Sequence, residues 1–387
     1  MRWHRQPRPR TTPLTEQGGR RGQLARSGLR PGWTTGACAS AAARAAWTAI
    51  LTGSFPDPVP VDLPLGRRPE FALTSWRMLD GEAEASVTKD AGDDPDVTHA
   101  AVIRVRVRRG APGTAVRFEA GLGVGTVTLP GLPLPVGEPA INPMPRAMIV
   151  ANLRSAAGLQ GSDPDPDVIV TVGIDGGELL AGRTLNARVG VLGGLSVLGT
   201  TGVVVPYSCS AWIDSIRRGI DVARATGHSE VAACTGSTSE QVARDSLGLP
   251  DVALIDMGDF VGAVLTYLRK HPVPRLHMVG GVAKFAKLAS GHLDLHSARS
   301  RVDTDHLARL ATNAGADDSL AALVLAASTA LEAVLLCEQN GVHLSAAIAD
   351  AARLEALRIL DGAPVAVDVI CVDRAGAILG RSGPSAA

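Results

Sequence analysis

Aromatic residues are scarce in this chain: phenylalanine, tryptophan and tyrosine together make up 3 % of its 387 residues. A surface that stacks successive nucleic-acid bases needs such side chains, so their scarcity argues against one. The chain also lacks a charge excess, because Lys+Arg and Asp+Glu both number 38. A neutral chain shows no overall electrostatic design for nucleic acid or for an anionic membrane. We therefore expect neither as a partner.

Cysteines are few, and long apolar runs are missing. The five cysteines are scattered, without a CxxC pair, which favours a reduced, cytoplasmic protein over a disulfide framework or a zinc module. No metal site is expected. Every apolar run is broken by glycine, proline or charge before it reaches membrane-spanning length, so we expect a soluble chain. Residues 1–28 hold seven arginines and one acid, Glu16; we expect a disordered extension there, not a signal peptide.

The length of the chain exceeds what one hydrophobic core usually supports, so two domains are expected. Residues 29–160 are typical of an α+β domain. They contain an alanine-rich helix ending near Leu51, a strand in which apolar residues alternate at 102–108, and a helix near Pro145. An acidic, proline-containing linker follows at residues 161–167, and we expect the domain boundary at its start.

Residues 161–380 show a different pattern, in which apolar runs end in glycine and lead into helical stretches. These runs occupy residues 168–173, 188–194, 229–236, 251–258 and 275–281. Such alternation is typical of a parallel sheet covered on both faces. Helices are expected over 303–360, and a last strand at 365–373. The expected fold class is therefore α/β: an α+β domain followed by a mostly parallel, Rossmann-like domain with C-terminal helices.

Loops after parallel strands are the usual ligand sites of such sheets. The densest candidate is "GGLSVLGTTG" at residues 193–202, which lacks both the G-x-G-x-x-G spacing and a Walker lysine. A glycine-rich loop of this kind is structural about as often as it binds a cofactor. The candidate cofactor-binding residues at these strand ends are Gly193, Gly194, Ser196, Gly199, Thr200, Thr201, Gly202, Gly236 and Asp259.

An aspartate-rich stretch, "VTKDAGDDPDVTHA", runs from Val87 to Ala100. Asp90, Asp93 and Asp94 are candidate acid or base residues, because clustered carboxylates bind hard cations or move protons. An EF-hand is excluded by the spacing. The alternative is a solvated loop in which the aspartates cap turns.

The stretch "TTGACAS" predicts the N-terminus of a helix, with a threonine cap and unpaired N–H groups. Cys38 would lie in the first turn, where the helix dipole is expected to lower its thiol pKa; the alternative is a buried small side chain. His292 and His296 are four residues apart, and we favour a structural role over zinc, since no third ligand is evident. Cations near the candidate loops suit a ligand with several carboxylates, or else surface ion pairs. They are Lys89, Arg146, Lys284, Lys287 and Arg299.

Six stretches in order resemble the cobalt-precorrin-5B C(1)-methyltransferases, the CbiD family, over residues 29–375. They are "GWTTGACASAAARAA", "VTKDAGDDPDVTHA", "GVGTVTLPGLPLPVGEPAINPMPRAMI", "GGLSVLGTTG", "MGDFVGAVL" and "KLASGHLDLHS". The sequence departs from the family pattern at Ala37, where a second threonine is usual, and at Gly281 and Val282, where many members have histidine and isoleucine.

The resemblance implies a CbiD-like two-domain architecture and methyl transfer from S-adenosylmethionine to C-1 of cobalt-precorrin-5B, giving cobalt-precorrin-6A in anaerobic-type cobalamin synthesis. Cobalt enters only as part of the substrate. Asp90, Asp93 and Asp94 would orient the ring edge or take a proton. The substrate's acidic arms would meet cations, hydroxyls and helix N-termini. The candidate substrate-binding residues are Thr34, Thr35, Gly36, Lys89, Asn142, Arg146, His296 and Ser297.

Three other interpretations stay open at this point. Glycine-ended strands also suit a nicotinamide or flavin oxidoreductase, although the dinucleotide fingerprint is missing. A non-catalytic carrier of corrinoid intermediates would explain the basic residues but not a separate nucleotide-type sheet. A methyltransferase acting on a metal-free precorrin would have the same sequence features. A homo-oligomer, and association with other corrin-pathway enzymes, are also left open.

Overall fold

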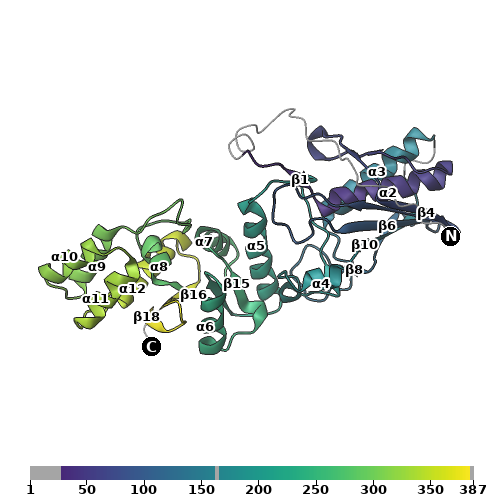
Figure 1. Ribbon diagram of the computed structural model, residues 1–387. Helices are drawn as coiled ribbons and strands as arrows, with labels where there is room; N and C mark the ends of the chain where they lie inside the picture. The colour runs from purple at the N-terminus through teal and green to yellow at the C-terminus, as the bar shows by residue number, and fades with distance from the viewer. Residues whose placement is uncertain (1–27, 162–164, 384–387) are drawn as a thin grey trace. The chain divides into compact units, whose positions relative to one another are not determined.

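The computed structural model describes residues 28–161 and 165–383, in two compact units that divide between Ser208 and Cys209 (Figure 1). The expected boundary at residues 160–161 lies earlier than this division. The reason is strand β10 (Val168–Ile174), which pairs antiparallel with β6 (Val102–Arg109) and parallel with β7 (Val116–Ala120), and so completes the sheet of the first unit. The expected disordered tail falls outside the described residues, except for Gly28.

Unit 1 is built on a five-stranded sheet in the order β4-β5-β6-β10-β7. β4 spans Ser75–Leu79 and β5 spans Glu82–Thr88. Apolar side chains alternate with polar ones along β5 and β6, so that Ala85 and Val105 are buried on one face while Glu84 and Arg104 project from the other. The strand expected at 102–108 is confirmed.

Helices α2 (Thr35–Thr52) and α3 (Pro143–Leu159) pack against each other, and α2 lies on the apolar face of this sheet (Figure 1). The Thr34 side chain caps α2 by accepting from the Ala37 amide, and Gly53 ends it in the left-handed conformation. The alanines of α2 are fully buried. Their small side chains let α2 approach both the sheet and α3 closely, which explains the alanine-rich composition.

Short elements complete unit 1. They are β1 (Gly32–Trp33), β2 (Val59–Pro60), η1 (Pro64–Gly66), β3 (Glu70–Phe71), β8 (Gly123–Val124), β9 (Thr126–Val127), α4 (Gly177–Ala181), η2 (Ala187–Val189), β11 (Val191–Leu192), β12 (Gly194–Leu195) and β13 (Val203–Val204). The run at residues 188–194 was expected to be a strand of the parallel sheet. It instead contributes to η2 and forms β11, which pairs with β9 in a separate two-stranded sheet.

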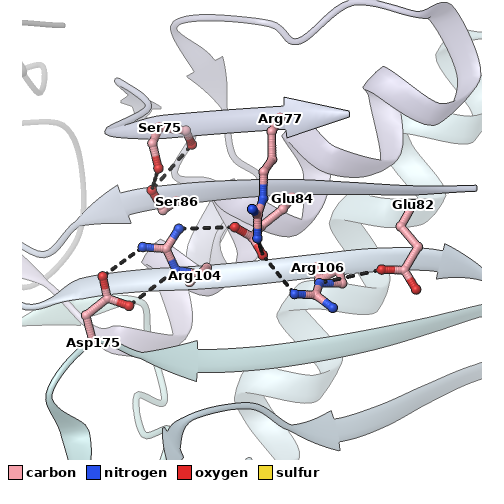
Figure 2. A network of polar contacts seen from close by, with 8 residues as sticks. All are labelled: Ser75, Arg77, Glu82, Glu84, Ser86, Arg104, Arg106 and Asp175. Atoms are coloured by element: carbon pink, nitrogen blue, oxygen red, sulfur yellow. Dashed lines mark hydrogen bonds and ion pairs between the residues drawn. The ribbon is translucent and has the colours of Figure 1, made fainter. Parts of the chain in front are cut away.

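The polar face of the unit 1 sheet carries a network of ion pairs, shown in Figure 2. Glu84 is 2 % exposed, and its carboxylate accepts from Arg77, Arg104 and Arg106 at 3.1, 3.1 and 3.3 Å. Arg104 also holds Asp175 through two hydrogen bonds. Burial alone would raise the pKa of Glu84. The hydrogen bonds from Arg77 and Arg104 outweigh it and hold the pKa below its ordinary value.

Unit 2 contains a second five-stranded sheet in the order β15-β14-β16-β17-β18. β15 (Leu254–Asp256), β14 (Glu230–Cys234), β16 (Arg275–Gly281) and β17 (Ala366–Val372) are parallel, and β18 (Ile378–Ser382) is antiparallel to β17. The mostly parallel sheet is thus confirmed, whereas its Rossmann-like character stays a prediction.

Helices cover both faces of this sheet. α6 (Ser237–Leu247) packs through Val242 and Ala243 on the face that presents Ala232 and Cys234. The opposite face of the sheet packs in the larger of the two apolar cores of unit 2. The helices that contribute to this core include α5 (Cys209–Ala225), α7 (Val261–Lys270), α8 (Val282–Ala289) and α12 (Leu344–Leu360). The other elements are η3 (Asp251–Ala253), α9 (Thr304–Asn313), α10 (Asp318–Ala326) and α11 (Ala330–Gln339). None of the helices in the described part of the chain has the length and apolar character that crossing a membrane requires.

Candidate functional site

Four of the sequence stretches singled out above meet at the N-terminal end of α2, in unit 1. The Trp33 amide donates to the Asp90 carbonyl at 2.7 Å, and the Asn142 amide donates to the Val197 carbonyl at 3.1 Å. Glycine is required where these backbones cross, because a Cβ on Gly32 would lie 2.0 Å from the carbonyl carbon of Ala91. We call this assembly the α2 junction. It comprises residues 32–36, 89–98, 141–146 and 193–202.

The α2 junction uses the amides that the sequence assigned to a ligand. The Thr34 amide donates to the Gly202 carbonyl, and the Gly36 amide donates to the Leu198 carbonyl, both at 3.0 Å. Thr34 and Thr35 are 8 % and 5 % exposed. The 193–202 loop thus already accepts from the Thr34 and Gly36 amides. Binding of an acidic substrate arm by Thr34, Thr35 and Gly36 stays a prediction.

The three candidate aspartates each hold a neighbouring segment. Asp90 accepts two hydrogen bonds from the Arg30 guanidinium, at 2.6 and 2.9 Å, and Asp93 accepts from the Arg30 amide at 2.6 Å. Asp94 accepts from the Tyr207 amide at 2.8 Å. The Arg30 hydrogen bonds hold the pKa of Asp90 below its ordinary value, so this carboxyl is ionised at neutral pH. These contacts join the aspartate-rich loop to segments far away in the sequence, and a catalytic role for the three aspartates stays a prediction.

The candidate cations of the α2 junction are also paired. Lys89 is 3 % exposed and contacts the Asp96 carboxylate and the Thr98 hydroxyl. Arg146 donates to Glu138 at 2.8 Å and to the Ile141 carbonyl, and its guanidinium lies 5.2 Å from the ring centroid of Phe118. Both cations therefore stabilise the junction itself. Sequence reasoning missed Arg30, the cation that pairs with Asp90. The available signal was its position just before the "GWTTG" stretch.

Cys38 behaves differently from the sequence expectation. Its side chain is fully buried in α2. Burial raises the pKa of the Cys38 thiol to about 12, whereas the helix dipole was expected to lower it. The alternative of a buried small side chain is the correct one.

A second candidate site lies in unit 2, where the parallel strands end. The loops after β14 and β15 begin at Thr235 and Met257, and β16 ends at Gly281, where α8 follows directly. These three strands are neighbours in the sheet. A Cβ added to Gly236 or Gly281 would meet no atom within 4 Å, so this edge is open at both positions. We call residues 235–236, 257–260 and 280–281 the strand-end edge.

The structure divides the predicted cofactor residues between the two units. Gly236 and Asp259 belong to the strand-end edge of unit 2, and the whole 193–202 loop belongs to unit 1. Asp259 forms an ion pair with Lys284 of α8. Lys287, 6 % exposed, donates to the Leu295 carbonyl at 2.9 Å. Burial, and then the charge of Lys284, lower the pKa of Lys287.

A segment after α8 is fixed to this edge by backbone hydrogen bonds. The Leu295 amide donates to the Asp259 carbonyl at 2.9 Å, and the Gly262 amide donates to the Leu293 carbonyl at 3.0 Å. This segment borders a cavity of about 460 Å³. The cavity is lined by His292, Ser297, Ala298, Arg299, Ser300, Arg301, Val302 and Asp303.

Two predicted substrate residues belong to this segment. Ser297 lines the cavity, and His296 is exposed, with its Nδ1 accepting from the Ala298 amide at 3.1 Å. α8 ends at Ala289, so His292 and His296 do not share a helix face. Within residues 28–161 and 165–383, no group of three or more His, Cys, Asp or Glu side chains is placed to hold a metal ion.

Two aromatic side chains at the strand-end edge escaped the sequence reasoning. Trp212 of α5 is 46 % exposed, and its Nε1 donates to the Asp256 carbonyl at 3.1 Å. Phe260 follows β15, with its ring centroid 6.3 Å from that of Trp212. Neither residue belongs to a spacing pattern, since Trp212 is a lone aromatic of α5 and Phe260 directly precedes α7, so the sequence offered no signal for either.

Comparison with known proteins places the chain in a family. The family model described as CbiD matches residues 23–206, and the model described as CbiD, C-terminal domain, matches residues 294–383. A crystal structure titled cobalamin biosynthesis protein (cbiD) from Archaeoglobus fulgidus is 27 % identical, covers 70 % of this chain and 83 % of its own, and has a TM-score of 0.37.

Curated relatives match nearly the whole length. A protein of Agrobacterium fabrum is 53 % identical over 92 % of this chain and 93 % of its own, and one of Paramagnetospirillum magneticum is 54 % identical over 91 % and 98 %. Both are named cobalt-precorrin-5B C(1)-methyltransferase. At this identity and coverage, the chain belongs to the CbiD family.

Proposed function

We propose that this chain transfers a methyl group from S-adenosylmethionine to C-1 of cobalt-precorrin-5B, giving cobalt-precorrin-6A. The observation that carries the proposal is the identity of 53 % and 54 % to relatives named for that activity, over more than nine-tenths of each chain. Cobalt belongs to the substrate. We also propose a cytoplasmic location, which the five free cysteines support. Oligomerisation and contacts with other pathway enzymes stay predictions.

The strand-end edge of unit 2 is where we place the methyl donor. Ligands of open parallel sheets bind beyond the carboxyl ends of the strands, and the open space at Gly236 and Gly281 leaves room for one there. The amide groups at the start of α6, an 11-residue helix, follow Gly236 directly. The 193–202 loop fits this role less well, because its carbonyls at Leu198 and Gly202 are taken by α2.

S-adenosylmethionine supplies an electrophilic methyl group when it is bound. The attacking carbon belongs to the substrate, so the chain needs no nucleophile of its own, consistent with the buried, protonated Cys38 thiol. What the protein contributes is position. The ion pair between Asp259 and Lys284 and the backbone bonds from Leu295 hold the loop after β15 in place.

We place an acidic arm of the substrate in the cavity beside this edge. Arg299 and Ser297 both line it, and a guanidinium beside a hydroxyl is a good acceptor site for a carboxylate. The ionised Asp90 is proposed to orient the α2 junction instead of moving a proton. Roles for Asp93 and Asp94 toward the substrate stay predictions.

The test is a methyl-transfer assay with purified chain, S-adenosylmethionine and cobalt-precorrin-5B, followed by mass spectrometry. We expect S-adenosylhomocysteine and a corrinoid heavier by one methyl group in equal amounts. Corrinoid binding without any product would favour the carrier. Binding of a nicotinamide or flavin without binding of S-adenosylhomocysteine would favour the oxidoreductase, and turnover of the metal-free ring alone would change the substrate.

A further inference from the structure

Trp212 lies in the first turn of α5 with its indole ring against the loop that follows β15. Its Nε1 donates to the Asp256 carbonyl at 3.1 Å. Gly258 adopts a φ of +51°, and a Cβ there would lie 3.1, 3.3 and 3.5 Å from three atoms of the indole ring. Glycine at this position is therefore what lets the backbone take its left-handed turn directly beneath the ring. The indole is held at one edge and supported from one side.

Phe260 lies beside the indole of Trp212, and Arg299 lies beside Phe260. The Phe260 ring is tilted by 52° to the indole, and the Arg299 guanidinium lies 6.0 Å from the Phe260 centroid. Arg299 also pairs with Asp294 at 2.5 Å. The indole supported by Gly258 and the Phe260 ring beside it thus form two adjoining aromatic surfaces next to Asp259.

Trp212 is the most exposed tryptophan in the described part of the chain. Trp33 and Trp47 are 4 % and 3 % exposed and Trp76 is partly buried, whereas Trp212 is 46 % exposed. Leaving half of an indole in water forgoes much of the stabilisation that its burial would give. An indole at the ligand-binding edge of a parallel sheet, anchored through its N–H and open on its face, suits stacking with a flat ring.

We propose that Trp212 stacks on the adenine ring of the methyl donor, with Gly258 as its support and Phe260 as a side wall. This inference rests on the proposed function, and it names the residue that recognises the nucleoside. A purine matches the dimensions of one indole bounded by a tilted phenyl ring. A tetrapyrrole macrocycle is several times wider than the indole of Trp212 and would contact the Phe260 ring.

The test is isothermal titration of the full chain with S-adenosylhomocysteine. Trp212→Leu removes the aromatic face and is expected to weaken binding about 10-fold or more. Trp212→Phe keeps an aromatic face and is expected to stay within about 3-fold of the unmodified protein. Leu325→Ala, at a side chain of α10 that is 47 % exposed, is the matched control and should bind normally. Thermal unfolding of each variant checks that unit 2 is folded.

Tryptophan fluorescence supplies a second readout. Adenine stacking should quench emission in the unmodified protein, and the quench should disappear in Trp212→Leu. Unchanged affinity of folded Trp212→Leu for S-adenosylhomocysteine would overturn the proposal. Normal binding of S-adenosylhomocysteine with weakened binding of a cobalt corrinoid would also overturn it, because the indole would then belong to the substrate site. If the unmodified protein fails to bind S-adenosylhomocysteine, the proposed function itself is contradicted, and this site with it.

Discussion

Glu84 and Arg104 form a hydrogen bond of 3.1 Å across neighbouring strands, on the side of the unit 1 sheet that faces away from α2. The Glu84 side chain is nevertheless 3 % exposed, because the arginines around it close over its carboxylate (Figure 2). A carboxylate removed from water in this way depends on its partners for solvation. The network therefore stabilises the sheet only while every member is present and charged.

Replacing Glu84 by glutamine should destabilise unit 1. The change keeps the shape of the side chain but removes the charge that Arg77, Arg104 and Arg106 share. We expect a loss of about 1–3 kcal/mol in the free energy of unfolding, measured by urea denaturation. Glu119→Gln is the control, because Glu119 is 47 % exposed and pairs with Arg108 alone among the charged residues described. Equal losses in the two variants would contradict the explanation.

The same network predicts how stability depends on pH. The pKa of Glu84 in the folded chain lies below its ordinary value. Its contribution is therefore complete above the unfolded pKa and is lost as the pH falls through the folded pKa. Asp90 and Asp96 have lowered pKa values too and act in the same direction. Urea denaturation between pH 6 and pH 3, at about one-unit steps, should show a steady fall. The fall should be smaller in Glu84→Gln, and an identical slope would refute the assignment.

Gly199 is predicted to be indispensable to the α2 junction. Its φ is +130°, and a Cβ there would lie 2.3 Å from the Thr34 hydroxyl oxygen. Gly193 has a φ of +82° in the same loop, but its Cβ would meet no atom within 4 Å. Gly193→Ala should thus report backbone strain alone, at about 1 kcal/mol, and Gly199→Ala should cost about 1–3 kcal/mol more. If Gly193→Ala and Gly199→Ala lower the free energy of unfolding equally within error, the close approach of Thr34 to Gly199 is not what makes glycine necessary there.

Secondary structure that depends on local pattern was predictable from the sequence. The alanine-rich helix expected to start at "TTGACAS" and to end near Leu51 is α2, Thr35–Thr52, because its threonine cap and its run of alanines are short-range signals. β10 shows the limit of this reasoning. Its apolar run is the same whether its neighbours are parallel or antiparallel, and those neighbours, β6 and β7, precede it by many residues. The domain boundary depended on that pairing, so it could not be read locally.

The candidate sites show the same limit. Composition picked out Asp90 and Asp94, but what these side chains do depends on Arg30, 60 residues before Asp90, and on Tyr207, 113 residues after Asp94. The strand-end edge was found in part, because glycine after a strand is a local signal for Gly236. Trp212 could be found only from the structure, since its significance comes from the loop on which it rests.

Thiol reactivity gives a last prediction, which separates the structural cysteines from an accessible one. Cys38, Cys234, Cys337 and Cys371 are buried, and Cys209 is partly exposed. Burial raises the pKa of both the Cys38 and the Cys371 thiols to about 12, so at pH 8 almost none of either is the reactive thiolate. Titration of the native chain with an aromatic disulfide reagent should therefore show about one fast thiol, which Cys209→Ser removes. The other thiols should react only after unfolding in urea. Fast reaction of a second thiol that survives in Cys209→Ser but is lost in Cys38→Ala would mean that the α2 end opens in solution.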